Sequence, residues 1–163
     1  MVLLPWKKIN MGKILKLDYL KTLIKKEKNK NKKVVLCHGV FDLIHIGHIK
    51  YFKEAKKNGD YLIVSITSDK YVNKGSGRPI FNQNYRAEFL SSLSLIDAVF
   101  INDYPTSEKI ISIIKPNVYF KGPDYKDNRS DRTKNIYKEI ASTKKFGGKV
   151  VYSSDVTFSS SNL

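Results

Sequence analysis

Short apolar runs alternate along this chain with stretches in which apolar residues recur every three or four positions. A short apolar run is typical of a buried strand, whereas the wider spacing is typical of a helix that covers one face of a sheet. The runs predict strands over residues 33–37, 61–66, 98–101, 117–120 and 149–152. The wider spacing predicts helices over 18–28, from about 49 to 58, from 84 past Leu93, over 106–114 and over about 133–145.

Strands that alternate with helices predict an α/β fold with a doubly wound, parallel, five-stranded sheet and right-handed crossovers. Residues 1–32 are interpreted as an N-terminal lead-in and helix, with 13–17 extended, and residues 33–163 as a single domain. Asp18 and Asn84 are expected to cap the first and third helices, and Gly59 to end the second. Ligands of such folds lie beyond the carboxyl ends of the strands, where the winding reverses.

Two connections are candidates for function because both follow predicted strands. Residues 67–82 form a long stretch that contains Gly75, Gly77 and Pro79, so we expect a mobile, functional loop. Pro116 terminates the helix before the fourth strand. A polar loop from 122 to about 131 follows that strand. Both loops are expected at the edge of the sheet where ligands bind.

The composition narrows the class of protein. With 163 residues the chain fits one domain with a proper hydrophobic core, and no apolar run is long enough to span a bilayer. Its first residues are too short an apolar segment for a signal peptide. The single cysteine, Cys37, excludes an intramolecular disulfide and fits a reducing interior, so we expect a cytoplasmic protein with no membrane partner.

The formal net charge of +15 raises the hypothesis of nucleic-acid binding. The densest basic run, residues 25–33, lies at a predicted helix end and loop, where cations are favourable and usually solvated. Only four of the 30 basic residues are arginine, the residue on which base readout depends. We therefore interpret the charge as attraction for anionic substrates and do not expect nucleic acid to be the main partner.

Two histidines flank a glycine where the first strand gives way to the second helix: His45, Gly47 and His48. The free N–H groups and dipole of a first helical turn attract phosphate, and imidazoles add donors that can carry charge near neutral pH. Gly47 has no Cβ, so a nucleotide can lie against the backbone. The pattern predicts a triphosphate site. Two alternatives stay open: hydrogen-bonded structural histidines, or half of a zinc site with Cys37.

Residues 39–48, Gly-Val-Phe-Asp-Leu-Ile-His-Ile-Gly-His, resemble the G-x-F-D-x-x-H-x-G-H signature of one branch of the H-x-G-H nucleotidylyltransferase superfamily. That branch includes glycerol-3-phosphate and choline-phosphate cytidylyltransferases and the heptose 1-phosphate adenylyltransferase domain. The resemblance runs from about Asp18 to the end and includes, in the family's order, residues 59–64, 68–69, 77–79, 86, 121–125 and 158–161. It implies the Rossmann-like nucleotidylyltransferase fold.

The resemblance implies nucleotidyl transfer, in which a phosphate oxygen of a phosphorylated sugar or polyol attacks the α-phosphorus of a nucleoside triphosphate and pyrophosphate leaves. Because the nucleophile is already an anion, the protein mainly has to hold two anions together and stabilise charge in an in-line transition state. By the resemblance, His45 and His48 contact the phosphates, and Lys74 and Arg86 join them as catalytic residues. Mg²⁺ is expected to accompany the triphosphate.

Binding roles also come from the resemblance. Gly39, Val40 and Phe41 offer backbone groups to the nucleotide, Gly47 lies against it, and Arg78 contacts the substrate phosphate. Asp42, in the same nucleotide-binding set, either ties its loop together or helps hold magnesium. The set is completed by Lys121, Gly122, Asp124, Tyr125, Ser159, Ser160 and Ser161. Pro123 stands where the K-G-G-D-Y pattern of the heptose enzymes has glycine, which removes an N–H and stiffens the loop.

The end of the chain distinguishes members of the branch. Glycerol- and choline-type enzymes carry R-T-E-G-I-S-T where this chain has residues 155–161, Asp-Val-Thr-Phe-Ser-Ser-Ser, without the arginine and glycine. This favours a phosphorylated sugar of the heptose 1-phosphate type, with ATP or CTP as donor. The resemblance further implies a homodimer. It also implies that the chain stops where relatives continue, so we expect a truncated piece or a domain joined to a sugar kinase.

The sequence also raises three other functions. One is a glycerol-3-phosphate-type cytidylyltransferase, and another is a non-catalytic basic module that binds nucleotide or nucleic acid. A gel-shift titration against salt distinguishes the second of these, because phosphate contacts give a steep salt dependence. An oxidoreductase domain is discounted, since no G-x-G-x-x-G follows the first strand.

Overall fold

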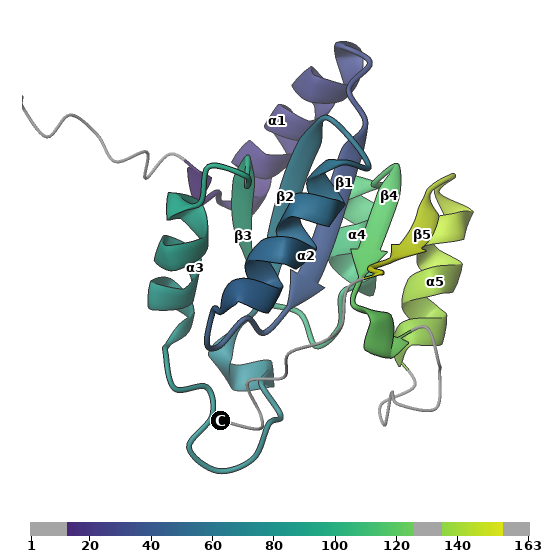
Figure 1. Ribbon diagram of the computed structural model, residues 1–163. Coiled ribbons are helices and arrows are strands. Elements are labelled where there is room, and N and C mark those ends of the chain that lie inside the picture. Colours follow the sequence, from purple (N-terminus) through teal and green to yellow (C-terminus); the bar gives the residue numbers. More distant parts are fainter. Residues whose placement is uncertain (1–12, 126–134, 155–163) are drawn as a thin grey trace, which may run out of the picture.

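The computed structural model of the chain describes residues 13–125 and 135–154 (Figure 1). Its strands form one parallel sheet in the order β3-β2-β1-β4-β5. The winding therefore reverses between β1 and β4, and the predicted doubly wound, five-stranded sheet is confirmed. The strands are β1 (Val34–Gly39), β2 (Tyr61–Thr67), β3 (Ala98–Asn102), β4 (Val118–Lys121) and β5 (Lys149–Tyr152).

Helices cover both faces of the sheet, α2 and α3 on one and α1, α4 and α5 on the other (Figure 1). None of the helices in residues 13–125 and 135–154 combines the length and hydropathy needed to cross a bilayer. Their bounds are α1 (Leu17–Asn29), α2 (Ile46–Lys56), α3 (Gln83–Ser92), α4 (Glu108–Ile114) and α5 (Asn135–Lys145), with 3₁₀ turns η2 (Asp69–Tyr71) and η3 (Pro123–Tyr125).

The alternation of side chains along β1 builds the core on both faces. Val35 and Cys37 join the cluster under α2 and α3, whereas Val34 and Leu36 join the cluster under α1 and α4. All four are fully buried, as a central parallel strand requires. Leu20 of α1 lies in the second cluster, so this helix packs on the same sheet as the rest of the chain.

The predicted caps of two helices are wrong by two residues each. Lys16, not Asp18, is the N-cap of α1 and makes no side-chain capping bond, while Asp18 lies in the first turn. Asn82, not Asn84, caps α3, because its side-chain oxygen accepts from the N–H groups of Asn84 and Tyr85 at 2.9 and 3.2 Å. A capping oxygen has to precede the free N–H groups that it satisfies, and both predicted residues already lie inside the helix.

Gly59 does not end α2, whose C-cap is Lys57. A Cβ at Gly59 would lie 2.7 Å from the carbonyl oxygen of Lys33, so the glycine is required by close approach of two backbone segments. The chain before β1 and the chain before β2 can therefore run side by side.

The loop after β2 contains more structure than predicted. It begins with η2, and the N–H of Asp69 donates to Gln83 Oε1 while the N–H of Gln83 donates to Asp69 Oδ2, both at 3.0 Å. Gly75 and Gly77 have φ values of 94° and 74°, which glycine adopts without strain. Both ends of the loop are thus fixed beside each other, and its mobility stays a prediction.

Candidate active site

His45 and His48 lie in the first turn of α2, at the carboxyl end of β1 and next to the reversal of the sheet. His45 is the N-cap, and its Nδ1 accepts from the N–H of Gly47 at 3.1 Å. The N–H of His45 donates in turn to Nδ1 of His48 at 3.4 Å. The two ring centroids are 4.0 Å apart. Imidazoles thus replace the hydroxyl and carboxylate that usually cap a helix start reciprocally.

This capping arrangement fixes where the ring protons lie. A ring nitrogen that accepts from an N–H carries no proton, so the proton of each neutral imidazole is on Nε2. Both histidines therefore offer an Nε2–H donor away from their own helix. Nε2 of His45 is buried and has no hydrogen-bond partner among the described residues. A buried donor without an acceptor is costly, and an anion at this position would satisfy it.

His48 acts as a neutral group. Burial, the largest cause, lowers the pKa of His48 to about 4, and the neighbouring His45 and Lys74 act in the same direction. Phe41 contributes to this burial, because its ring lies edge-on to His48 at 5.6 Å and packs at a tilt on Phe52 of the core at 5.2 Å. The ring is therefore a hydrogen-bond donor near neutral pH rather than the cation that the sequence allowed.

The backbone between β1 and α2 is partly used by the protein itself. Gly39 is paired with Ile66 in the sheet, the carbonyl of Val40 accepts from Arg86, and the N–H of Gly47 donates to His45. Phe41 has a φ of 49°, the left-handed region, where the chain turns away from β1. Nucleotide contacts of this backbone stay a prediction.

Asp42 ties the β1–α2 loop to the loop after β2. Its side chain is fully buried and accepts from Arg78 at 2.9 Å and from the N–H groups of Ile80 and Phe81 at 2.8 and 3.2 Å. Burial opposes ionisation, but these donors outweigh it and hold the pKa of Asp42 below its ordinary value. Of its two interpretations, the structure shows the tie.

The electrostatics bring Lys74 into the same site. Desolvation, the largest cause, lowers the pKa of its ammonium, with Arg78 acting in the same direction and Asp42 opposing. Its charge also lowers the pKa of His48. A loop residue and a helix residue far apart in the sequence therefore share one electrostatic environment. Contact of Lys74 and Arg78 with substrate phosphates stays a prediction.

Arg86 is placed differently from its predicted catalytic role. Its side chain is fully buried on α3 and donates to Asp69 Oδ1 at 2.7 Å and to the carbonyl of Thr67 at 2.8 Å. It also donates to the carbonyl of Phe81 at 3.0 Å and to that of Val40. The guanidinium is enclosed by protein oxygens in this conformation, and its catalytic role stays a prediction. It joins the loops that follow β1 and β2.

The last residue of β4 likewise turns its cation inward. Lys121 is 4% exposed, and its Nζ donates to Glu139 Oε2 of α5 at 3.2 Å. The same Nζ lies 3.9 Å from the ring centroid of Tyr125, which is 37% exposed. This differs from the predicted contact of Lys121 with nucleotide, because the ammonium is enclosed by protein groups. Gly122, Asp124 and Tyr125 form the turn above it, and their nucleotide contacts stay a prediction.

His38 and Glu139 are polar residues of this edge that the sequence analysis did not single out. His38 Nδ1 lies 3.1 Å from Ser65 Oγ, and burial, the largest cause, lowers the pKa of His38 to about 4. Glu139 also accepts from the hydroxyl of Tyr119 at 3.0 Å. A histidine at the end of an apolar strand was the only local signal, and nothing near Glu139 in sequence indicates its partner.

The last predicted group, Ser159, Ser160 and Ser161, lies outside the described residues. The chain that leads to it is anchored to α2, because Glu54 accepts from the N–H of Ser154 at 3.0 Å and from its hydroxyl at 2.9 Å, and also from the hydroxyl of Ser153. The structure therefore fixes the start of this last segment on the helix that carries the histidines.

No group of three or more histidine, cysteine, aspartate or glutamate side chains suited to a metal occurs in the part of the chain that the structure describes. Asp42 does not fit as a magnesium ligand, since both of its oxygens already accept from protein donors. Cys37 is fully buried in the core. This position does not suit the zinc ligand of the alternative interpretation.

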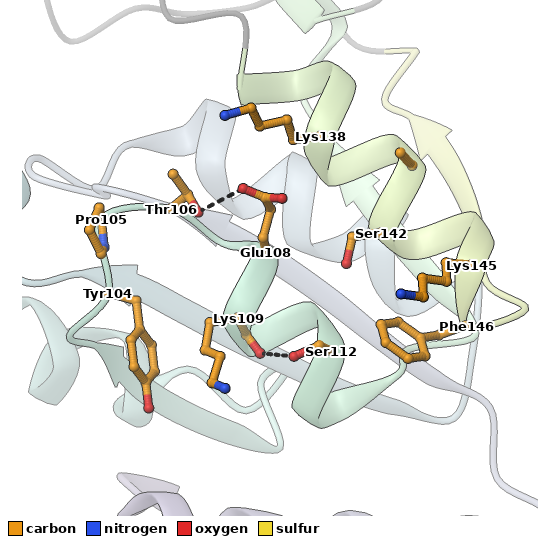
Figure 2. Close-up of a pocket in the computed structure, with 11 residues that line it drawn as sticks. Tyr104, Pro105, Thr106, Glu108, Lys109, Ser112, Lys138, Ser142, Lys145 and Phe146 are labelled. Carbon is orange, nitrogen blue, oxygen red and sulfur yellow. Dashed lines mark hydrogen bonds between the residues drawn. The ribbon is translucent and has the colours of Figure 1, made fainter.

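A groove of about 720 Å³ lies between α4 and α5 (Figure 2), on the face of the sheet opposite to α2 (Figure 1). Lys109, Lys138 and Lys145 line it together with Tyr104 and Phe146. Its volume alone assigns it no function, because the chemistry predicted from the sequence lies at the carboxyl edge of the sheet.

Comparison with known proteins agrees with this geometry. The family model described as cytidylyltransferase-like matches residues 36–162. The chain is 38% identical over 141 residues to the bifunctional protein HldE of Geotalea uraniireducens, covering 85% of this chain and 27% of that protein. It is 44% identical over 116 residues to HldE of Geobacter metallireducens, covering 70% and 24%. The chain thus spans about a quarter of the length of these relatives.

Among solved structures, the chain is similar to a lipopolysaccharide core biosynthesis protein from Thermoplasma volcanium, with a TM-score of 0.64 and 29% identity over 77% of this chain and 99% of that one. A pantoate-beta-alanine ligase from Francisella tularensis shares the fold alone, with a TM-score of 0.56 and 18% identity over 86% of this chain and 66% of that one.

Proposed function

From the premise that the chain belongs to the cytidylyltransferase-like family and is a nucleotidyltransferase, we propose that it transfers a nucleoside monophosphate from ATP or CTP to a phosphorylated sugar of the heptose 1-phosphate type. A phosphate oxygen of the sugar forms a bond to the α-phosphorus, the bond to the β-phosphate oxygen breaks, and pyrophosphate leaves with that electron pair.

The observation that carries the proposal is the pair of Nε2–H donors of His45 and His48 at the start of α2. The Nδ1 atoms are held by backbone N–H groups, so the rings cannot turn without loss of the helix cap. Fixed donors aimed at developing charge stabilise a transition state without reorganisation. An α-phosphate that faces the Nε2 atoms of the two rings would gain negative charge on its oxygens during transfer, which these donors would stabilise.

Two observations support the proposed acceptor. The residues of the K-G-x-D-Y segment and of the chain end follow the heptose type more closely than the glycerol type, and the bifunctional proteins HldE are 38% and 44% identical to the chain. A sugar kinase, either fused to the chain or separate, would then supply the phosphorylated acceptor. The reaction requires nucleoside triphosphate, which fits the proposed cytoplasmic location.

Magnesium is proposed to enter with the triphosphate, held by phosphate oxygens. The described residues offer no carboxylate cage for it, since Asp42 is engaged with Arg78. The part assigned to the protein is therefore restricted to the Nε2–H donors of His45 and His48 and to the ammonium of Lys74, which lies next to Gly75 in the loop after β2. Lys74 would neutralise phosphate charge as the substrates meet.

The test is pyrophosphate release by the full chain with magnesium, using ATP, CTP, GTP and UTP against sugar 1-phosphates and glycerol 3-phosphate. We expect release with one sugar 1-phosphate and one nucleotide, and loss of this release in His48→Ala. Lys50→Ala, at an exposed position of the same helix, is the control and should leave the release unchanged. Release with glycerol 3-phosphate and CTP alone would support the glycerol-type alternative, and no release from folded protein with any pair would contradict the proposal.

A homodimer is the second part of the proposal. Tyr85 and Phe89 are 62% and 50% exposed and lie four residues apart on α3, so they share one face of this helix. Ile80 and Phe81, which are 53% and 48% exposed, precede the helix and add to the exposed apolar surface. A second copy of the chain packed on this surface would bury it. Sedimentation velocity tests this: the wild type should sediment as a dimer and Tyr85→Glu as a monomer. An unmodified chain that is monomeric at micromolar concentration would exclude the dimer.

A further inference from the structure

Lys121 is surrounded by protein groups on every side that the structure records. Its ammonium contacts the carboxylate of Glu139 at 3.2 Å, the hydroxyl of Tyr119 at 3.5 Å and the ring of Tyr125 at 3.9 Å. With 4% of its surface exposed, it has no free face comparable to that of Lys74. A lysine that binds phosphate as a point charge needs such a face. The contacts therefore point to a different use of this cation.

The position of this ammonium is fixed from three elements. The hydroxyl of Tyr119 on β4 donates to Glu139 on α5 and lies 3.0 Å from the hydroxyl of Ser107, just before α4. Burial, the largest cause, would raise the pKa of Glu139. The Lys121 ammonium, together with the hydroxyls of Ser107 and Tyr119 and with His38, outweighs burial and lowers this pKa. A buried ion pair with its remaining bonds satisfied has one geometry, so the cation is held in place.

Tyr125 is the group that this fixed cation contacts on its outer side. The ring is 37% exposed, and the turn below it is closed by the N–H of Tyr125, which donates to the carbonyl of Gly122 at 3.3 Å. An ammonium over an aromatic face attracts the ring electrostatically. The turn follows β4 at the reversal of the sheet, where a doubly wound fold binds its ligand. One face of the ring is thus held and the rest is open at the ligand edge.

We propose that Lys121 is a positioning residue, which holds the ring of Tyr125 against the nucleoside side of the site and does not itself contact the nucleotide. This inference rests on the proposed nucleotidyl transfer. Lys121 would then affect how tightly the nucleotide binds, and not how fast the bound nucleotide reacts.

The kinetic test uses Lys121→Met combined with Glu139→Gln, because the methionine alone would leave a buried carboxylate without a counter-charge. We expect KM for the nucleotide, tested as ATP and CTP, to rise about tenfold while kcat stays within twofold. Lys121→Arg, which keeps the cation, should restore most of the affinity, and Lys138→Met on the exposed side of α5 should change neither. A loss of kcat with unchanged KM would overturn the proposal.

A double-mutant comparison separates action through the ring from direct contact. Tyr125→Leu should raise KM about as much as the Lys121 and Glu139 changes, and the combination should be no worse than either alone, because both remove the same positioned ring. If the two effects multiply to roughly a hundredfold, Lys121 contacts the nucleotide independently of Tyr125 and the proposal is wrong.

A third measurement needs no nucleotide. Hydrogen exchange of the Tyr125 amide should be at least tenfold faster in the Lys121→Met, Glu139→Gln variant than in the wild type, while amides of β1 stay unchanged. Unchanged exchange at Tyr125 would show that Lys121 does not hold the turn. If the wild type bound neither ATP nor CTP, the proposed function would fail, and this exchange result would still decide whether the turn is held.

Discussion

The turn after β1 and the turn after β4 lie side by side at the carboxyl edge of the sheet and treat their polar groups in opposite ways. After β1, His45 and His48 are locked by backbone N–H groups and leave Nε2–H donors, one of them buried and without an acceptor among residues 13–125 and 135–154. At the end of β4, under the turn that follows, the ammonium of Lys121 is neutralised by Glu139 of α5. The contrast indicates that the first turn is built for a ligand and the second for rigidity.

The largest effect is expected after β4, on stability. Glu139→Leu leaves the Lys121 ammonium buried without its counter-charge and should lower the free energy of unfolding by about 3–5 kcal/mol. Adding Lys121→Met to that variant should recover most of the loss, since both charges are then gone. Urea unfolding measures this, with the exposed Glu88→Gln on α3 as the control. A small effect of Glu139→Leu would mean that the second turn is not held by charge.

After β1 the expected effect is on rate. His45→Ala removes one fixed donor and should lower kcat by about 10²–10³. His45→Asn keeps an acceptor for the N–H of Gly47 and should restore helix capping without restoring turnover. Thermal unfolding and pyrophosphate release on the same samples separate the two roles. Recovery of activity by asparagine would show that His45 acts only as a cap.

The turn after β1 also contains a buried charge that is paired within the protein, the carboxylate of Asp42. Asp42→Asn weakens three hydrogen bonds to a buried carboxylate and should destabilise the protein by about 1.5–3 kcal/mol. The exposed Asp103→Asn, which weakens a surface pair with Lys70 and a hydrogen bond from Ser68, should cost clearly less, because solvent screens exposed charges. Equal losses in denaturant unfolding would show that the Asp42 tie is no stronger than a surface ion pair.

The smallest effect is on the dependence of stability on pH. The pKa of His38 is lowered to about 4 by burial, with Glu139 opposing and Lys121 adding to the shift. Between pH 6.5 and about 4 the unfolded chain binds a proton at His38 that the folded chain does not, so stability falls as pH falls, by at most about 1.4 kcal/mol per pH unit. Chemical unfolding at pH 6.5, 6.0 and 5.5 should show a flatter dependence in His38→Asn than in the wild type.

The sequence predicted the elements well because their apolar spacing is local. β5 has the predicted bounds, and both loops of interest follow strands as expected. The caps were displaced because neighbouring polar residues such as Asn82 and Asn84 are equivalent until the backbone fixes the first turn. The placement of Arg86 and Lys121 could not be predicted, since their partners Asp69 and Glu139 lie 17 and 18 residues away along the chain.

The two ends of α2 serve different parts of the protein. His48 lies in the first turn of this helix, and Glu54 holds Ser154 from its later part. One inserted or deleted residue between them would turn the carboxylate by about 100° around the helix axis. Homologous chains that keep the His48 site and the Glu54–Ser154 hydrogen bond therefore need the same separation of six positions between histidine and glutamate. Insertions are tolerated only in the flanking loops.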